Sequence, residues 1–289
     1  MSAAIEVFDT AFQNPVMLAA GTAGFGRELK DVIDLDRLGG IVTKAVSPEP
    51  RAGHAAPRVA EFEGGMLNAV GLANPGMERV AEVELPWLER HLERARVLVN
   101  VVGFVVEDYV TVVERLSSAG VITAFELNVS CPNTDRGGEE FGADRAILAD
   151  LVRRCRAATE KPLVVKLSPT LPDVAATAEA AAQAGADGFS LVNTIPGTLF
   201  GLGAEVAQTR LGYRQGGVSG PALLPVGVSA TRRVRERTGL PVIGVGGIRT
   251  LEDVDQYLEA GASLVAVGTA GMASPRLPQR LAEEWERRG

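Results

Sequence analysis

Two lysines lie inside apolar runs of this 289-residue chain, where a charged side chain is unusual. Lys44 follows Val42 and Thr43, and Lys166 lies within Val164–Leu167. Burying an ammonium group without an anionic partner is costly, so the sequence implies such a partner for each lysine. The alternative is a pair of solvated surface charges, which the apolar flanks disfavour.

Asparagines close three further apolar runs, at Asn100, Asn128 and Asn193, and the last of these is followed by Thr194. Asparagine is a common loop former, so any one of these positions could be only a strand end. Two lysines and three asparagines at five strand ends are harder to explain in that way. Their ammonium and carboxamide groups suit a ligand with a carboxylate and amide-like edges.

Glycines follow the last two apolar runs, as Gly246-Gly247 and as Gly268-Thr269. Glycine lets backbone N–H groups approach an anion closely, and the N-terminus of a following helix adds its positive end. A pair of glycines alone is weak evidence. Two such elements at consecutive strand ends predict a phosphate site.

The two cysteines call for different interpretations. Cys131 precedes a polar, glycine-bearing loop, Thr134–Gly142, which could close over a ligand, so its thiol could be a nucleophile or a proton acceptor. Cys155 falls on the apolar stripe of a helical pattern and is predicted to be core. His54 and His91 are isolated, and no zinc-ligand spacing occurs, so no metal is expected.

The elements that must position these residues recur along the chain as apolar runs rich in valine, isoleucine and leucine, each followed by an amphipathic or alanine-rich stretch. Continuous apolar runs are typical of parallel strands covered on both sides. The predicted strands are Val16–Gly21, Gly40–Ala45, Val97–Gly103, Ala124–Ser130, Leu163–Ser168, Gly188–Thr194, Val242–Gly247 and Leu264–Thr269.

Eight strands alternating with helices predict an α/β protein, a single (β/α)8 TIM barrel over residues 1–289, with a doubly wound open sheet as the alternative. The segment Ile5–Asn14 alternates as a hairpin that would close the barrel floor. Ser47–Pro75 is too long for an ordinary loop and predicts an insertion over the C-terminal face. Thr250 with Asp253 predicts a helix N-cap.

Composition narrows the function classes. Hydrophobic residues make up 46% of the chain, which is enough for a sizeable core, and the net charge of −7 argues against a nucleic-acid partner. No apolar stretch approaches the ~20 residues that span a bilayer. We therefore expect a cytoplasmic protein without a membrane partner, whose cysteines remain thiols in a reducing compartment.

Four motifs resemble one family over essentially the whole chain. They read GMLNAVGLANPG at residues 65–76, ELNVSCPN at 126–133, VKLSP at 165–169 and GVSGP at 217–221. They are similar to class 1 dihydroorotate dehydrogenases, and the first and last are similar to the catalytic subunit of the NAD-linked class 1B type. Class 2 enzymes have serine where this chain has Cys131.

The resemblance implies oxidation of dihydroorotate to orotate in pyrimidine synthesis, with hydride passed to one flavin mononucleotide (FMN) per subunit. It implies that Cys131 is the general base, which requires the thiol's usual pKa of about 8.5 to be tuned by its surroundings. It also implies that Lys166 lies beside the pyrimidine edge of the flavin and stabilises the negative charge that arrives with the hydride.

The resemblance also implies two binding sets, matched position by position. Ala20 would contact flavin through its backbone, because relatives often have serine there. The flavin set is Ala20, Gly21, Lys44, Ala45, Asn100, Asn128, Lys166, Val192, Gly220, Gly246, Gly247, Gly268 and Thr269. The substrate set is Lys44, Asn68, Ala69, Val70, Gly71, Leu72, Asn128, Asn133, Asn193 and Thr194.

The class 1B resemblance further implies a homodimer core with a second subunit that carries FAD and a 2Fe-2S cluster and passes electrons to NAD. The chain itself has neither a dinucleotide fingerprint nor cluster-binding cysteines. Three alternatives remain at this point: a fumarate-linked class 1A enzyme, a Schiff-base aldolase using Lys44 or Lys166, and a non-catalytic phosphate-binding barrel.

Overall fold

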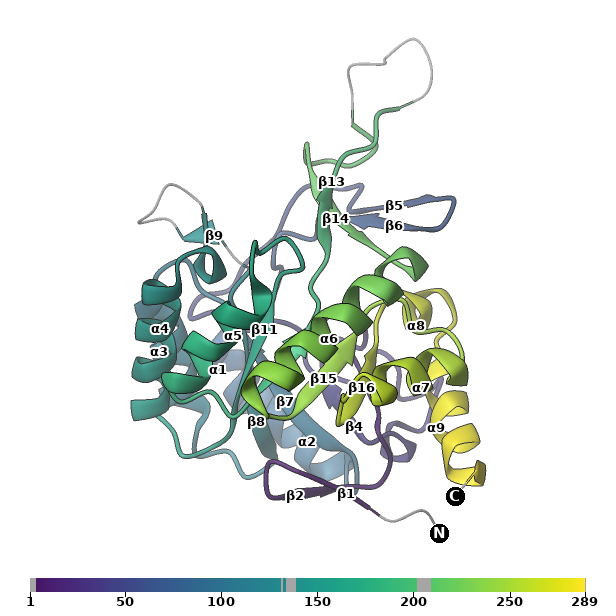
Figure 1. The fold of residues 1–289 in the computed structure, drawn as a ribbon, viewed down its shortest axis with the longest axis horizontal. Coiled ribbons are helices and arrows are strands. Elements are labelled where there is room, and N and C mark those ends of the chain that lie inside the picture. Colours follow the sequence, from purple (N-terminus) through teal and green to yellow (C-terminus); the bar gives the residue numbers. More distant parts are fainter. Residues whose placement is uncertain (1–3, 131, 134–138, 202–208, 289) are drawn as a thin grey trace.

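Eight parallel strands close into a barrel in the computed structural model, which describes residues 4–130, 132–133, 139–201 and 209–288 (Figure 1). The strand order around the barrel is β11-β12-β15-β16-β3-β4-β7-β8, and β8 pairs with β11 to complete it. The closed sheet confirms the (β/α)8 prediction and excludes the doubly wound alternative. The strands are β3 (Val16–Leu18), β4 (Gly40–Val42), β7 (Arg96–Val101), β8 (Ile122–Asn128), β11 (Leu163–Leu167), β12 (Gly188–Leu191), β15 (Val242–Val245) and β16 (Leu264–Val267).

All eight strands end before their predicted C-terminal residues, although single hydrogen bonds continue the pairing beyond some of them, as from the Asn193 N–H to the Leu167 carbonyl. The residues beyond each strand instead form the rim of the barrel. This is the face at which barrels of this kind carry their functional residues.

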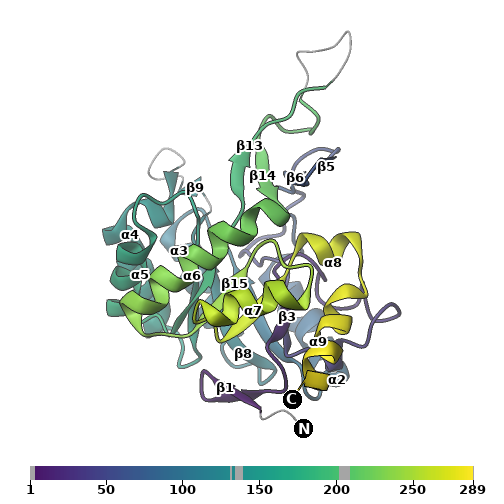
Figure 2. The same ribbon diagram turned by 45° about the vertical axis from the view of Figure 1, so that its right-hand side comes forward.

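Helices cover the outside of the barrel (Figure 2). The first connection, from β3 to β4, differs from the prediction: it holds only a 3-10 turn, η1 (Leu35–Arg37), after a series of tight turns at positive-φ glycines. No helix in the described residues is both long and apolar enough to cross a membrane. The other helices are α1 (Met77–Arg79), the π-helical turn η2 (Val80–Glu84), α2 (Leu85–His91), α3 (Val106–Leu116), α4 (Arg145–Ala157), α5 (Val174–Gln183), α6 (Leu224–Thr238), α7 (Leu251–Glu259), α8 (Thr269–Ala273) and α9 (Leu277–Arg288), with short 3-10 turns η4 (Phe141–Ala143) and η5 (Pro221–Leu223).

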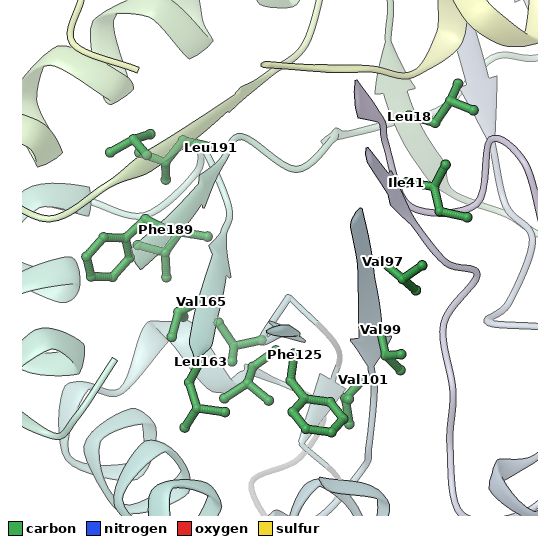
Figure 3. Close-up of a cluster of buried hydrophobic side chains, with 14 of the residues drawn as sticks. Leu18, Ile41, Val97, Val99, Val101, Phe125, Leu163, Val165, Phe189 and Leu191 are labelled. Carbon is green, nitrogen blue, oxygen red and sulfur yellow. The ribbon is translucent and has the colours of Figure 1, made fainter. Parts of the chain in front are cut away.

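Side chains alternate between two cores along each strand. Outward residues such as Val97, Val99, Phe125 and Val165 pack against the helices (Figure 3). Inward residues fill the lower half of the barrel with a second apolar cluster that includes Met17, Leu98, Ala124, Val164 and Ile243. The lower barrel is therefore a packed core rather than a channel.

A hairpin closes the floor, as predicted for Ile5–Asn14. It consists of β1 (Ile5–Val7) and β2 (Thr10–Phe12), paired in antiparallel fashion. Val7 and Phe12 are buried in the inner apolar cluster, so the hairpin seals the barrel from below. In Figure 1 it lies at the end opposite the inserted strands.

Two insertions form a separate four-stranded sheet above the barrel, in the order β13-β14-β6-β5. The predicted Ser47–Pro75 insertion contributes β5 (Val59–Phe62) and β6 (Gly65–Asn68). The connection after β12 contributes β13 (Ile195–Gly197) and β14 (Gly216–Ser219), which the sequence pattern does not predict. The rim of the barrel is therefore covered by two segments that are distant in sequence.

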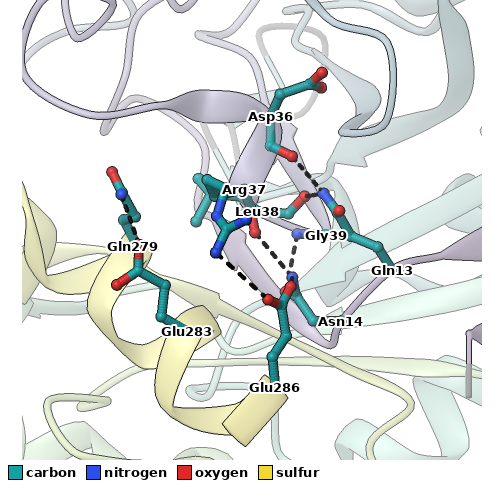
Figure 4. A network of polar contacts seen from close by, with 9 residues as sticks. All are labelled: Gln13, Asn14, Asp36, Arg37, Leu38, Gly39, Gln279, Glu283 and Glu286. Atoms are coloured by element: carbon teal, nitrogen blue, oxygen red, sulfur yellow. Dashed lines mark hydrogen bonds and ion pairs between the residues drawn. The ribbon is translucent and has the colours of Figure 1, made fainter. Parts of the chain in front are cut away.

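A buried asparagine joins the seam between β3, β4 and the C-terminal helix (Figure 4). The Asn14 side chain is 0% exposed. Its Oδ1 accepts hydrogen bonds from the N–H groups of Val16 at 3.1 Å and Gly39 at 3.0 Å. Its Nδ2 donates to the Arg37 carbonyl at 2.9 Å and to Glu286 Oε1 at 3.2 Å. One amide thus satisfies backbone groups of two neighbouring strands and holds α9 against them.

We predict that Asn14→Ala lowers the free energy of unfolding by about 3 kcal/mol, because the Val16 N–H and the Arg37 carbonyl lose their side-chain partner and Glu286 loses its link to this seam. Urea denaturation followed by circular dichroism measures the change. Gln279→Ala is the control, since Gln279 also links α9 to its surroundings but is only half-buried. A loss for Asn14→Ala no larger than that for Gln279→Ala would contradict the assigned role.

Candidate functional site

The interior of the barrel changes from apolar to polar toward the rim. Asn100, Glu126 and Lys166 each lie two residues beyond an apolar inward-facing residue on β7, β8 and β11, so they face the same interior. All three are buried, as is Ser190 on β12, which pairs with Lys166. A polar layer therefore rests directly on the apolar filling of the barrel.

Glu126 is the anionic partner that the sequence implied for Lys166. The Glu126 Oε1 to Lys166 Nζ distance is 3.6 Å, and the same oxygen accepts a hydrogen bond from Asn100 Nδ2 at 2.6 Å. Glu126 was not singled out from the sequence. The signal was present, because Glu126 is a charged residue within an apolar run and shares the inward parity of Asn128.

The predicted residues Asn128 and Asn193 are brought together at the rim. Asn193 Nδ2 donates to Asn128 Oδ1 at 3.2 Å, and Asn193 Oδ1 accepts from the Thr194 N–H at 2.8 Å. The Tyr109 hydroxyl donates to the Asn128 carbonyl at 2.8 Å and so fixes the end of β8 from outside. These contacts align two carboxamides on neighbouring parts of the rim.

Lys44 and Ala45 follow β4 and are half-buried. Burial lowers the pKa of the Lys44 ammonium below its usual value of 10.5; Glu28 opposes that shift and Arg58 adds to it. The Lys44 N–H donates to the Gly24 carbonyl at 2.8 Å, which ties β4 to the turns after β3. Glu28 is thus the acidic neighbour of this second lysine.

The insertions bring Asn68 and Thr194 together. Asn68 ends β6 and pairs with Gly217 of β14, to whose carbonyl its Nδ2 donates at 3.2 Å. Thr194 packs so closely against Gly217 that a side chain at residue 217 would overlap it. Beyond β6, the Ala69 N–H donates to the Arg58 carbonyl at 2.8 Å and the Val70 carbonyl accepts from the His54 N–H at 3.1 Å.

The two residues after Val70 have left-handed backbone conformations. Gly71 has a φ of 71°, and Leu72 has a φ of 58°, which is uncommon for a residue with a side chain. His54 packs against Gly71 closely enough to exclude a side chain there. Residues 68–72 of the substrate set therefore form one tightly turned segment that begins at the end of β6.

Glycines form the predicted corner at the ends of β15 and β16. Gly246 and Gly247 have φ values of 118° and 80°, and a Cβ at Gly247 would lie 2.5 Å from the Leu224 nitrogen. The Thr269 hydroxyl donates to Ser219 Oγ at 2.7 Å, which brings the end of β16 beside Gly220, whose φ is 117°. Gly268 and Gly21 face nearly open space, because a Cβ at Gly268 would meet only Ala19 at 3.8 Å and one at Gly21 would meet nothing.

The helix that follows Gly246-Gly247 differs from the expectation of a positive helix end at the anion site. α7 begins at Leu251, and its Asp253 carboxylate accepts hydrogen bonds from the N–H groups of Arg249 at 2.8 Å and Thr250 at 2.9 Å. The predicted Thr250 cap is confirmed. The negative charge of the capping carboxylate already complements this helix end.

The structure describes some of the remaining predicted positions and not others. Ala20 is half-buried after β3, and Val192 is buried after β12, with its N–H donating to the Val245 carbonyl at 2.8 Å. Cys131 and the side chain of Asn133 lie outside the described residues. Their assigned roles stay predictions.

Glu140 anchors a short strand beside β11. β9 (Pro132–Asn133) pairs with β10 (Glu139–Glu140) in antiparallel fashion. Burial raises the pKa of the Glu140 carboxyl, and hydrogen bonds with Ser168 and Thr170 partly offset that shift. These contacts fasten β10 to the chain just beyond β11.

Cys155 lies in the core, and both histidines stack on aromatic rings. Cys155 is buried on α4 as predicted, and burial raises the pKa of its thiol to about 12. His54 stacks on Tyr213 with ring centroids 3.9 Å apart, and His91 stacks on Trp87 at 4.2 Å. The described residues contain no group of three or more histidine, cysteine or acidic side chains arranged to hold a metal ion.

Comparisons with known proteins agree with the resemblance noted in the sequence. A family model described as dihydroorotate dehydrogenase matches residues 2–288. A protein of Bacillus thuringiensis (strain Al Hakam), named "Dihydroorotate dehydrogenase B (NAD(+)), catalytic subunit", is 45% identical over 280 residues, covering 97% of this chain and 89% of that protein. Proteins of the same name from Bacillus cytotoxicus and Bacillus anthracis (strain A0248) are 44% identical over the same shares.

Tyr257 on α7 supports the glycine corner from outside the barrel, a role that the sequence does not predict. Its hydroxyl donates to the Gly246 carbonyl at 2.8 Å, and burial raises its pKa.

We predict that Tyr257→Phe lowers the free energy of unfolding by about 1 kcal/mol, because the Gly246 carbonyl loses its partner. Urea denaturation measures this loss. Tyr213→Phe is the control, since Tyr213 is exposed; equal losses in the two variants would refute the supporting role.

Proposed function

The chain belongs to the dihydroorotate dehydrogenase family, and we propose that it oxidises dihydroorotate to orotate in pyrimidine synthesis with bound FMN. The observation that carries this proposal is the polar layer inside the barrel, where Lys166 is paired with Glu126 next to Asn100. A buried ammonium group at this depth suits a reaction that delivers negative charge to a bound ring.

The described residues fit FMN in two respects. Asn100 Oδ1 and Ser190 Oγ are buried and have no hydrogen-bond partner within the described residues, so polar groups remain for a ligand in the barrel interior. Gly21 and Gly268 border open space at the rim, where backbone groups can approach a phosphate. We propose that Gly246, Gly247, Gly268 and Thr269 hold the phosphate, and that Lys166, Asn100 and Asn128 hold the ring.

The remaining flavin contacts are proposed from the family match. Ala20 and Gly21 lie after β3, Lys44 and Ala45 after β4, and Val192 after β12. Gly220 precedes η5. These positions surround the same rim, which supports one continuous cofactor site.

Bound FMN supplies the hydride acceptor, and the chain's own residues supply charge, orientation and a base. Lys166 holds a positive charge beside the ring, which stabilises the incoming negative charge without reorganising during the reaction. Cys131 removes the proton from the substrate carbon next to the one that loses hydride. The apolar filling of the lower barrel excludes water from beneath the reacting groups.

We propose that Lys44 binds the carboxylate of dihydroorotate and that the carboxamides bind its amide edges. Asn128 and Asn193 are already aligned by their mutual hydrogen bond, which supports recognition of a planar amide. Asn68 and Thr194 approach from the two insertions, residues 69–72 line the turn beside Asn68, and Asn133 completes the set by the family match.

We further propose that residues 1–289 act as one catalytic domain in the cytoplasm, as a homodimer with an electron-transfer subunit. The relatives are named as catalytic subunits, which supports a complex with a second chain, and the NAD(+) in their name supports that acceptor over fumarate. The partner would carry FAD and a 2Fe-2S cluster. The relatives' name also supports this function over an aldolase or a non-catalytic barrel.

A direct test is anaerobic reduction of the purified protein. We expect the protein to be yellow, and dihydroorotate to bleach its flavin absorption. Cys131→Ala should leave the flavin bound while slowing reduction by at least about 100-fold, because a positioned base contributes that much. Cys155→Ala is the matched cysteine control and should retain the rate. A colourless protein, or equal rates in Cys131→Ala and the unmodified enzyme, would contradict the proposal.

The acceptor is tested separately. We expect NAD to be reduced rapidly only when the electron-transfer subunit is added, and fumarate to be reduced poorly. Rapid fumarate reduction by this chain alone would assign it to the class 1A type instead.

The lowered pKa of Lys44 predicts a pH dependence of substrate binding. Because burial lowers the pKa of the Lys44 ammonium, this group loses its proton as the pH rises, before pH 10.5 is reached. KM for dihydroorotate should therefore increase with rising pH already below pH 10.5, while kcat changes less. Steady-state kinetics across the alkaline range measure this. Lys44→Arg should bind substrate more weakly but show no such rise, because arginine stays charged. A KM that stays constant up to pH 10.5 would contradict carboxylate binding by Lys44.

A further inference from the structure

Glu126 is a buried carboxylate to which the proposed reaction gives no step. Its side chain is 1% exposed, and it lies on β8 between the two strands that carry Asn100 and Lys166. A carboxylate is costly to bury, so its presence inside the barrel requires compensation by its neighbours. Both neighbours belong to the proposed flavin site.

One oxygen of Glu126 serves both neighbours. Oε1 accepts a hydrogen bond from Asn100 Nδ2 at 2.6 Å and lies 3.6 Å from Lys166 Nζ. Because a carboxylate can only accept, it turns the Asn100 amide so that Nδ2 faces Glu126. Asn100 Oδ1 is then left without a partner among the described residues, as an acceptor for a ligand.

We propose that Glu126 is a positioning residue that holds the Lys166 ammonium in place and thereby sets the reduction potential of the bound flavin. The inference rests on the proposed function, since it requires FMN beside Lys166. Lys166 is 7% exposed, and within the described residues its one ion pair is with Glu126. Without Glu126, no carboxylate among the described residues would hold this ammonium in place.

Two roles for Glu126 predict opposite signs. If the carboxylate acts through Lys166, Glu126→Gln releases the ammonium from its position beside the ring, reduced flavin binds less tightly than before, and the potential falls. If the carboxylate acts only as a nearby negative charge, its removal favours the reduced flavin, and the potential rises.

The experiment measures the two-electron midpoint potential of the FMN holoenzyme by anaerobic redox titration. We expect Glu126→Gln to weaken binding of reduced relative to oxidised FMN about tenfold, which corresponds to a fall of about 30 mV. Glu126→Asp, which keeps the charge, should restore part of the difference.

A double-mutant cycle separates the two routes. In a Lys166→Met background, Glu126→Gln should cause no fall in potential, since the group through which it acts is gone. Glu84→Gln is the matched control: Glu84 is 6% exposed and pairs with Arg27 at 2.9 Å and Arg79 at 3.5 Å, outside the barrel interior. It should leave the potential unchanged even if it lowers stability.

A rise in potential for Glu126→Gln, or an equal fall with and without the Lys166 ammonium, would overturn the inference. If Glu126→Gln fails to fold, Glu126→Asp is the fallback variant. Its shorter side chain places the carboxylate farther from Lys166, so the potential should fall. That fall should be absent in the Lys166→Met background. Failure of the unmodified protein to bind FMN, or of dihydroorotate to reduce it, would instead refute the proposed function and the inference with it.

Discussion

The ammonium group of Lys166 can occupy the interior of a closed barrel because Glu126 on the neighbouring strand accompanies it. That pairing constrains much of the surrounding structure. It requires β8 and β11 to be adjacent and in the observed register, because Glu126 pairs with Val164 and Lys166 with Asn128. It also requires an apolar filling below, since water entering from the floor would weaken the attraction between the two charges. The floor hairpin meets that requirement.

The glycine corner shows a similar dependence between layers. The Tyr257 ring lies against Gly227 on α6 and Gly244 on β15, and a side chain at either position would overlap it. Its hydroxyl reaches the Gly246 carbonyl through the space that these glycines leave. The conformation of the rim is thus set from the helical layer outside the barrel.

The strands and the hairpin could be predicted because runs of valine, leucine and isoleucine report burial directly. The partner of Lys166 could not be identified with the same certainty, because it depends on which strands become neighbours when the barrel closes. The corner supported by Tyr257 has no local pattern, since its hydrogen bond joins a helix to a distant loop. β13 and β14 were not predicted, because proline and glycine give a weak strand signal. These two strands contain Pro196, Gly197, Gly216 and Gly217. The role of Cys131 was predicted from the family resemblance and stays a prediction.

The upper sheet has a consequence for how this site can change during evolution. In many barrels each rim loop is an independent unit, so one loop can vary in length while the others keep their roles. Here β6 and β14 come from different loops and are hydrogen-bonded to each other, with Asn68 and Thr194 meeting at Gly217. An insertion or deletion within β6 or β14 would shift the register of their pairing. The two loops must therefore be inherited as one unit, and exchanging a single loop between relatives should disturb ligand recognition on both sides of the site.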